Sequence, residues 1–420
     1  MDFKCKCYVI DAVCGAGKTS AVINMIKQSD NDQKFLYITP FLDEVKRIKD
    51  SCRSKHFKSP KFENGGTKLD NIKKLFANGD NIVTTHALFQ KFDNETIEII
   101  KLNSYTLVMD EVAQVVDDFP ITQYDYDNLT NTYVDIKDDT KQLVWRKEYE
   151  DYKGEFDNYK RLCELGSLVH YGGEKKLMVW LFPIKCFNAF TNIYILTYMF
   201  KSQLQSWYYN YYGLPYEFLS VDGNSLDTYH LIEYDDNKNY IKYDYSKLIH
   251  ILDNEKLNKI GEDDYSLGSS WYERNAGSSI IMKSLKNNIY NYFKNIVHGN
   301  SKDNIWTTFK DYKSKLKGEG YSKGFIPVNS RATNEYKDRF NIAYPVNRFL
   351  NPYVKNFFTS NNIEINEDGW ALSEMLQFIW RSAIRDGKEI NVYIPSKRMR
   401  NLLKAWIEEN KLVWYYIIWG

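Results

Sequence analysis

One short stretch near the start of the chain constrains the fold more than any other. Residues 12–19 read AVCGAGKT, which fits the pattern A-x-x-G-x-G-K-T. CYVIDAV, residues 7–13, leads into it and is typical of a strand, and SAVINMIKQ after it has the apolar spacing of a helix. A glycine-rich turn between a strand and a helix is the arrangement of a phosphate-binding loop, so the sequence predicts a nucleotide-binding α/β sheet.

Each part of this loop has a distinct chemical role. Glycines let the backbone curl so that successive N–H groups point at a β-phosphate, and the following helix directs its positive end there. Lys18 can reach the β- and γ-phosphates, and the Thr19 hydroxyl can ligate Mg²⁺. ATP and Mg²⁺ are therefore the expected cofactors. The residues expected to bind the nucleotide are Gly15, Ala16, Gly17, Lys18, Thr19 and Ser20.

A second motif, LVMDEVA, supplies the acids that ATP hydrolysis needs. It is an apolar run that ends in Asp110 and Glu111, as expected of a buried parallel strand. Asp110 is expected to hold Mg²⁺, and Glu111 to polarise the attacking water. A glutamate in that role indicates a hydrolase, because a kinase must keep water away from the transferred phosphoryl group.

Strand-like and helix-like segments alternate along most of the chain, which predicts an α/β fold with mainly parallel sheets. The 420 residues suffice for two domains. The turn-rich SVDGNSLDTY places the division near residue 225, giving an ATP-binding lobe at 1–225 and a second lobe at 226–420. Residues 121–175 are charged, tyrosine-rich and weakly periodic, and are expected to be a partly helical insertion. KKLMVWLFP should resume the first sheet, and YHLIEYD and KGFIPVNS should be strands of the second.

Composition narrows the possible partners. The formal net charge is +1, so any basic surface must be local. The apolar runs are shorter than the roughly 20 residues of a membrane span, and no signal-peptide pattern opens the chain. Six scattered cysteines without a CxxC pair indicate free thiols in a reducing compartment. A cytoplasmic protein, in the host if phage-encoded, is the expectation.

The order of motifs resembles that of superfamily 2 helicases, which include the DEAD- and DEAH-box proteins. AVCGAGKT resembles their motif I, YITPFLDEV motif Ia, IVTTHALF the following DNA-contacting segment, and DEVA motif II. ILTYMF stands where motif III is found, with Thr197 as the matching hydroxyl, and residues 327–340 weakly resemble motif V. The likeness is strongest to phage-encoded replication helicases and implies two RecA-like lobes.

The second half contributes a further motif, QFIWRSAIR. It resembles motif VI, which implies that Gln377, Arg381 and Arg385 reach the ATP. A planar, permanently charged guanidinium suits the charge spread over a γ-phosphoryl group. On one continuous helix the two arginines would be an i, i+4 pair on a shared face, and a solvated basic helix face is the alternative. Trp380 stands where the family has glycine, which leaves open which arginine is the finger.

The nucleic-acid track is expected on the first lobe. The resemblance places Thr39, Thr85 and His86 on it. Residues 46–61 add local positive charge that could neutralise phosphates, although a solvated surface is as good a reading. Lys46 and Arg47 are the basic residues expected there to contact nucleic acid. The seven basic residues of this segment are Lys46, Arg47, Lys49, Arg53, Lys55, Lys58 and Lys61.

Together these patterns favour an ATP-dependent translocase or helicase that closes two lobes around ATP and moves along or unwinds DNA. The resemblance implies single- or double-stranded DNA as the partner, allows RNA, and adds other replication proteins; it implies no membrane. Two alternatives stay open. One is a terminase-like DNA-packaging ATPase, which should carry a nuclease half with clustered carboxylates, and the other is an ATP-switched DNA-binding scaffold that does not unwind.

Overall fold

A computed structural model describes residues 2–40, 42–63, 65–172, 177–235, 243–328 and 335–419, with side chains to residue 411. The chain forms two compact units. The first comprises Met1–Ala12, Gly17–Lys238 and Asn351–Ile365. The second comprises Val13–Ala16, Asn239–Leu350 and Asn366–Gly420. None of the described helices is both long and apolar enough to cross a membrane.

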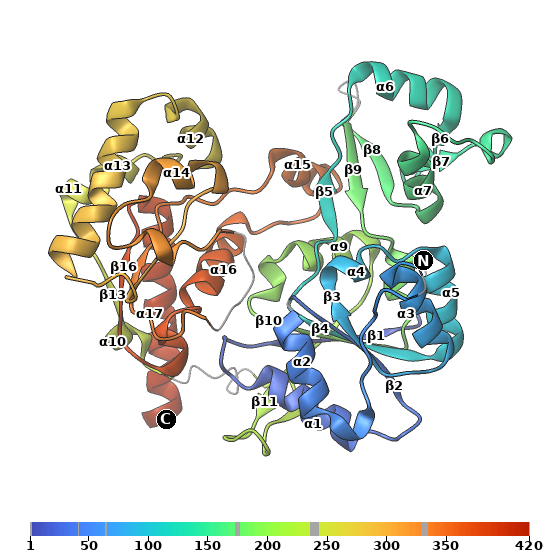
Figure 1. Ribbon diagram of the computed structural model, residues 1–420, viewed down its shortest axis with the longest axis horizontal. Coiled ribbons are helices and arrows are strands. Elements are labelled where there is room, and N and C mark those ends of the chain that lie inside the picture. Colours follow the sequence, from blue (N-terminus) through green and yellow to red (C-terminus); the bar gives the residue numbers. More distant parts are fainter. Residues whose placement is uncertain are drawn as a thin grey trace. The chain divides into compact units, whose positions relative to one another are not determined.

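The first unit is built around a seven-stranded sheet that is parallel except for one edge strand (Figure 1). Its buried strands are near-continuous apolar runs, as expected where helices cover both faces of a parallel sheet. In spatial order the strands are β12 (His230–Glu233), β11 (Glu217–Asp222), β1 (Lys6–Asp11), β10 (Asn192–Thr197), β4 (Tyr105–Asp110), β2 (Lys34–Thr39) and β3 (Ile82–Thr85).

Alternate residues of each strand meet helices on opposite faces. Val108 packs with α1 (Lys18–Gln28) and α2 (Leu42–Ser51) on one face. Tyr105 packs on Phe76 of α3 (Lys68–Ala77), and Met109 lies beside Gln205 of α9 (Leu204–Tyr212), on the other. The remaining helices of this part are α4 (His86–Phe89), α5 (Asn94–Asn103), α6 (Gln123–Asn128), α7 (Asp157–Leu165) and α8 (Ile184–Phe187).

The middle of the first unit has a sheet of its own. It is antiparallel, in the order β5 (Val116–Asp118), β9 (Leu177–Leu181), β8 (Leu168–Tyr171), and it adjoins the hairpin of β6 (Val134–Ile136) and β7 (Leu143–Trp145) (Figure 1). Its aromatic cluster centres on Tyr133, which stacks on Trp145. The expectation that KKLMVWLFP resumes the main sheet is wrong. That strand, β9, pairs with β5 and β8 instead, because its apolar residues serve the smaller core.

The second unit contains a four-stranded parallel sheet in the order β13 (Ile249–Ile251), β16 (Ile390–Tyr393), β15 (Asn341–Ala343), β14 (Asn304–Trp306). Trp306 and Tyr393 are fully buried in its core. The expected α/β class with mainly parallel sheets in two lobes is thus confirmed. The helices of this unit are α10 (Tyr245–Leu248), α11 (Glu255–Asn258), α12 (Ser269–Asn275), α13 (Ser279–Asn291), α14 (Lys313–Leu316), α16 (Glu367–Ile379) and α17 (Lys397–Trp419).

Two strands expected in the second lobe are assigned differently by the structure. YHLIEYD forms β12, which pairs antiparallel with β11 and so completes the first sheet. The described part of KGFIPVNS makes only an isolated bridge, between Trp306 and Phe325. The division expected at residue 225 stays a prediction about domains, whereas the first compact unit continues to Lys238.

One segment of the second half returns to the first unit. Residues 351–365 include α15 (Pro352–Ser360), which packs against β5 and β9. The ring of Phe357 lies 5.0 Å from that of Tyr211 and 5.9 Å from that of Tyr171, and Phe358 packs edge-on against Trp207. The Asn351 amide donates to Asp118 Oδ1 at 2.7 Å. Aromatic burial therefore fixes α15 on the first unit.

We expect Phe357→Ala to release α15. Phe357 is 0% exposed, and removing a buried phenyl ring costs about 3–5 kcal/mol. Hydrogen exchange of the amides of residues 353–360 should accelerate strongly in this variant. Tyr353→Ala is the matched control, because Tyr353 is on the same helix and 47% exposed. Equal protection of α15 in the two variants would contradict this account of its docking.

Candidate nucleotide and nucleic-acid sites

Three strand ends of the first sheet lie in register. Asp11 at the end of β1 is paired with Thr197 of β10, and Leu196 is paired with Asp110 of β4. The Ala12 N–H donates to the Thr197 carbonyl at 3.1 Å, and the Glu111 N–H to the Leu196 carbonyl at 2.9 Å. The phosphate loop and the acid pair therefore leave the same edge of the sheet, where parallel α/β sheets bind ligands.

The phosphate loop has the backbone geometry that a phosphate requires. Gly15 and Gly17 have φ of +89° and +85°, in the left-handed region that favours glycine. Helix α1 begins at Lys18, and no side chain caps its N-terminus. The Lys18 ammonium donates to the Ala12 carbonyl, across the loop that it follows. An uncapped helix end with a lysine over the loop suits the phosphates of a nucleotide.

A contact that the sequence did not reveal fixes Gly17. A Cβ on this residue would lie 2.5 Å from the ring of Tyr229, so only glycine fits beneath the tyrosine. The Asn24 amide of α1 holds the same turn, donating to the carbonyls of Leu226 and Tyr229 at 2.9 Å each. Tyr229 lies more than 200 residues along the chain from Asn24, and a lone tyrosine in a turn gives no sequence signal of this contact.

Burial and neighbouring charges shift the pKa of Asp110, the first residue of the acid pair. Burial raises the pKa of Asp110 to about 7, and the charges of Glu111 and Glu44 add to the rise. Lys18 and Arg47 oppose it, so both cations act at the Asp110 carboxyl. A buried carboxyl that resists ionisation by itself is suited to a divalent cation, which would supply the missing positive charge. Asp110 with the Thr19 hydroxyl would be the residues to hold Mg²⁺.

Glu111 has an unusual backbone. Its φ is +75°, a conformation that costs a residue with a side chain about 1–2 kcal/mol. Strain of this kind at a side chain predicted to position water is typical of functional sites. Its N–H bond to the Leu196 carbonyl holds the strained turn against β10.

A further acid, Asp11, was missing from the sequence prediction. Its carboxylate accepts from the Met199 N–H at 2.7 Å and the Phe200 N–H at 2.9 Å, and so ties the loop after β10 to β1. Burial raises the pKa of Asp11, and these hydrogen bonds act against the rise. The sequence signal that could have identified Asp11 is its position as an acid at the end of the apolar strand YVID. Thr197, the predicted motif III hydroxyl, is fully buried beside it.

The residues predicted to contact nucleic acid fall into two groups. Thr39 and Thr85 are register partners at the ends of β2 and β3. Thr39 is fully buried, while Thr85 is partly exposed. His86 is also buried, with Nε2 3.0 Å from the Asp110 carbonyl oxygen, so it links this strand end to the acid pair. The structure thus brings Thr39, Thr85 and His86 to the same edge as the phosphate loop.

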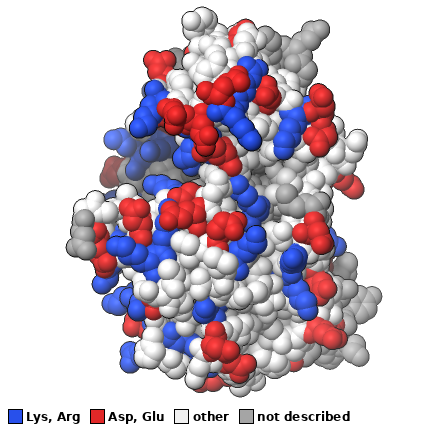
Figure 2. Space-filling view, turned by 90° about the vertical axis from the view of Figure 1, so that its right-hand side faces the viewer, with Lys and Arg blue, Asp and Glu red and all other residues white. Residues whose placement is uncertain are grey.

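The basic stretch is mixed in role. Lys46 is exposed, whereas Arg47 forms an ion pair with Glu44 at 2.9 Å. Lys55 is buried and donates to the carbonyls of Ser29 and Asp30, which makes it structural. Figure 2 shows Lys and Arg interspersed with Asp and Glu over the face drawn, as the net charge of +1 leads one to expect.

The predicted arginines lie in the second unit. Arg381 is 3% exposed, with its guanidinium carbon 5.5 Å from the Phe378 ring centroid. The expectation that Arg381 and Arg385 share one helical face is wrong, because α16 ends at Ile379 and Arg385 lies in the 3₁₀ turn Ala383–Asp386. Gln377 is on the last turn of α16 and half-buried.

Trp380 is the C-cap residue of that helix. Its ring packs against Tyr245 and Trp406, at 5.1 and 5.4 Å between centroids, and so closes the hydrophobic core beside α17. The tryptophan in place of the family's glycine therefore serves packing. Of the weak motif V segment, residues 329–334 lie outside the described residues.

The pKa of Asp110 predicts a pH-dependent cost to folding. A carboxyl whose folded pKa is about 7 destabilises the fold as pH rises from its unfolded value near 4 towards 7, by up to about 1.4 kcal/mol per pH unit. Asp110→Asn should therefore raise the melting temperature without Mg²⁺ more at pH 8 than at pH 5.5. Asp32→Asn, at an exposed position of the same unit, is the matched control. A pH-independent gain for Asp110→Asn would contradict the raised pKa.

The φ of Glu111 predicts opposite effects of glycine at two sites. The Glu111→Gly variant should be more stable than the Glu111→Gln variant, by up to about 1 kcal/mol. Glycine has no Cβ and adopts a φ of +75° without steric strain, whereas glutamine keeps the strain. The control is Glu98 on α5, exposed and helical, where glycine should be about 1 kcal/mol less stable than glutamine. Chemical denaturation of the four variants measures both differences, and the same sign at both sites would contradict the strain.

Three family models match parts of the chain. Residues 4–139 match the DEAD/DEAH box helicase family, residues 116–180 the YonV middle domain, and residues 243–407 the YonV C-terminal Rossmann-like domain. Two solved structures, one described as "XPD_APO" and the other as Xpd4 of S. tokodaii, have TM-scores of 0.49 and 0.45. They are 13% and 12% identical, and each alignment covers 96% of this chain, with 96% and 94% of the other.

One relative is a Bacillus subtilis (strain 168) protein described as "SPbeta prophage-derived uncharacterized protein YonV". It is 43% identical over 413 residues, which are 96% of this chain and 99% of that protein. The resemblance to phage-encoded superfamily 2 helicases is confirmed by the helicase domain and this prophage relative. The chain therefore belongs to the YonV family, and its first part is a DEAD/DEAH-box helicase domain.

Proposed function

We propose that this protein is a nucleic-acid-stimulated ATPase that uses ATP·Mg²⁺ to move along or unwind DNA. The observation that carries the proposal is the shared strand edge of the first sheet, from which the phosphate loop and the acid pair both leave. Lys18 acts electrostatically on Asp110, as expected of two residues that bind one nucleotide. Such a site cleaves a phosphoanhydride by positioning and charge stabilisation.

Each residue has a proposed role in this reaction. Lys18 and the N–H groups of residues 15–20 bind the phosphates, while Thr19 and Asp110 hold Mg²⁺. Glu111 orients the water, and its strained backbone is consistent with a fixed position. Gln377, Arg381 and Arg385 complete the site when the second lobe closes on ATP, one arginine serving as the finger.

Contact with DNA is proposed at the strand ends that carry Thr39, Thr85 and His86, where Thr85 is partly exposed, and at the exposed Lys46 and Arg47. Coupling arises because His86 is hydrogen-bonded to the Asp110 backbone, so a shift at the strand end moves the metal-binding residue. ATP-driven lobe closure would then change the grip on the strand. Replication proteins are the natural partners of such a motor in a phage. DNA is proposed ahead of RNA from the helicase resemblance alone.

Four variants test this mechanism. Lys18→Ala should lose nucleotide binding or turnover, and Glu111→Gln should bind ATP and turn it over at least about 100-fold more slowly. Arg381→Lys and Arg385→Lys keep the charge and lose the planar fork, so the finger is the one whose replacement lowers kcat about 10³-fold or more. ATPase rates with single-stranded DNA, duplex DNA and RNA, and without nucleic acid, supply the measurement.

Two outcomes would contradict the proposed mechanism, and two others would favour the alternative functions. Full DNA-stimulated turnover by Lys18→Ala would remove the phosphate-loop assignment, and normal turnover by both arginine variants would remove the two-lobe mechanism. DNA cleavage with Mn²⁺ would favour a terminase-like packaging ATPase. Tight ATP binding without turnover or strand displacement would favour an ATP-switched scaffold.

A further inference from the structure

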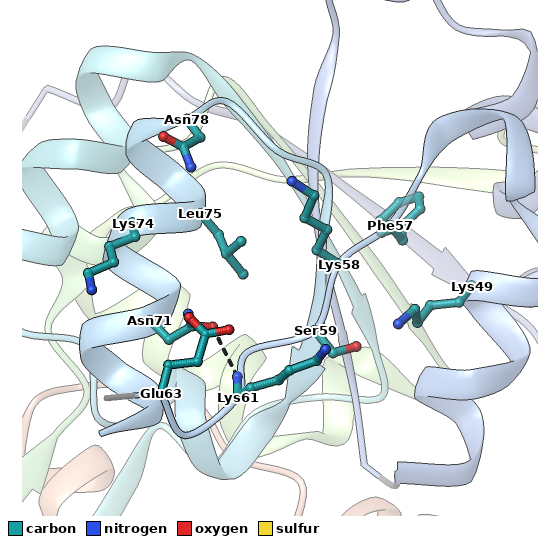
Figure 3. Close-up of a pocket in the computed structure, with 10 residues that line it drawn as sticks. All are labelled: Lys49, Phe57, Lys58, Ser59, Lys61, Glu63, Asn71, Lys74, Leu75 and Asn78. Atoms are coloured by element: carbon teal, nitrogen blue, oxygen red, sulfur yellow. Dashed lines mark hydrogen bonds between the residues drawn. The ribbon is translucent and has the colours of Figure 1, made fainter. Parts of the chain in front are cut away.

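A hollow of about 350 Å³ lies on the first unit between α2 and α3 (Figure 3). Four lysines line it, from α2, α3 and the segment that joins them: Lys49, Lys58, Lys61 and Lys74. Leu75 points into the hollow and gives it an apolar wall. The pocket therefore gathers basic residues that are up to 25 positions apart in the sequence, of which only three belong to the basic stretch 46–61.

The pocket is separate from the strand-end motifs. Lys58 bridges to Ile82, the first residue of β3, and its carbonyl accepts from the Val83 N–H at 2.9 Å. Thr85 is the last residue of that strand, three positions on, which corresponds to about 10 Å along a strand. The pocket is thus at the opposite end of β3 from Thr39, Thr85 and His86, whereas the predicted contacts Lys46 and Arg47 are on α2, which also carries Lys49.

Positive charge in the pocket exceeds negative charge. Lys58 is paired with Asp80 at 2.7 Å, and Glu63 accepts from the Asn71 amide at 2.9 Å. Counting the four lysines against these two acids leaves two uncompensated positive charges. In the part of the chain that the structure describes, Lys49, Lys61 and Lys74 form no ion pair. Ammonium groups around one hollow repel one another unless an anion neutralises them.

The wall of the pocket offers a neutral donor as well. The Ser59 hydroxyl oxygen is buried and has no hydrogen-bond partner among the described residues. The segment that carries it is held in place, because the Lys61 N–H donates to Asn71 Oδ1 at 3.0 Å. A buried hydroxyl in the wall of a hollow lined by three lysines without an ion pair matches the several oxygens of a phosphate, which accept from mixed donors.

We propose that this pocket binds backbone phosphate of a DNA strand, as an anchor distinct from the strand-end contacts. The identity of the polyanion rests on the proposed function. Each lysine carries a compact charge on a flexible side chain and contacts phosphate rather than bases. Its contacts are therefore independent of the DNA sequence, as expected of a site that holds any DNA strand. The pocket adjoins the start of β3, the edge strand of the sheet. It is therefore placed to bind DNA that extends beyond the segment contacted by Thr85 and His86.

The test removes the three unpaired ammonium groups together. The pocket variant carries Lys49→Gln, Lys61→Gln and Lys74→Gln, and the matched control carries Lys27→Gln, Lys91→Gln and Lys101→Gln, which are exposed on the same unit. Affinity for fluorescent single-stranded and forked DNA is measured by anisotropy between 50 and 200 mM salt. Circular dichroism and ATP turnover without DNA check that both variants stay folded.

The expected result is weaker DNA binding by the pocket variant and a shallower salt dependence. The slope of log K against log salt should fall by about 0.7 to 0.9 for each phosphate group that the pocket variant no longer binds. Over a fourfold rise in salt, the affinity of the pocket variant should therefore fall about 3-fold less than that of the control for each such group. Equal behaviour of pocket variant and control would overturn the proposal.

A third arm distinguishes DNA from a small phosphate ligand. Pyrophosphate binding is measured by calorimetry on Lys18→Ala, which removes the phosphate loop as a competing site. Pyrophosphate binding that the pocket substitutions abolish, together with unchanged DNA affinity, would assign the pocket to a small phosphate and overturn the DNA assignment. DNA binding is measured without ATP. A wrong proposed function would therefore show as an ATPase rate that DNA does not raise, whereas a wrong pocket proposal would show as unchanged DNA affinity of the pocket variant.

Discussion

The backbone register of β1, β10 and β4 is the constraint on which the rest of the site depends. Hydrogen bonds between these strands fix where each one ends, and the turns that follow must carry the functional groups. The phosphate loop, Thr197 and the acid pair therefore need no contacts of their own to find one another. A slip of one residue in β4 would turn Asp110 to the other face of the sheet.

Two residues that these strands position, Asp110 and Glu111, are in energetically unfavourable states that a bound ligand would offset. Asp110 is buried beside other acids, and Glu111 has a strained backbone. Both cost stability in the protein alone, and both are compensated by the strand pairing beneath them. Functional sites commonly retain such costs, since the same features fix a metal ion and a water molecule in place.

The sequence predicted what local pattern determines and missed what distant contacts determine. Strand, glycine loop and helix around Lys18 have short-range signals, and the apolar run before Asp110 identifies a buried strand. Tyr229 over Gly17 could not be found, because the two are brought together by sheet order. β9 was misassigned because an apolar run does not say which sheet receives it. The helix was extended too far, through Arg381, because the apolar pattern of QFIWRSAIR contains no local signal for the end of α16 at Ile379.

The return of α15 to the first unit has a consequence for biosynthesis. The last piece of that unit, residues 351–365, leaves the ribosome after more than a hundred residues of the other unit have been made. The aromatic surface formed by Tyr171, Trp207 and Tyr211 must wait uncovered during that interval. The amino-terminal part therefore lacks this covering helix as it emerges, and a nascent chain of this protein exposes aromatic surface for a period in which a chaperone would be of use.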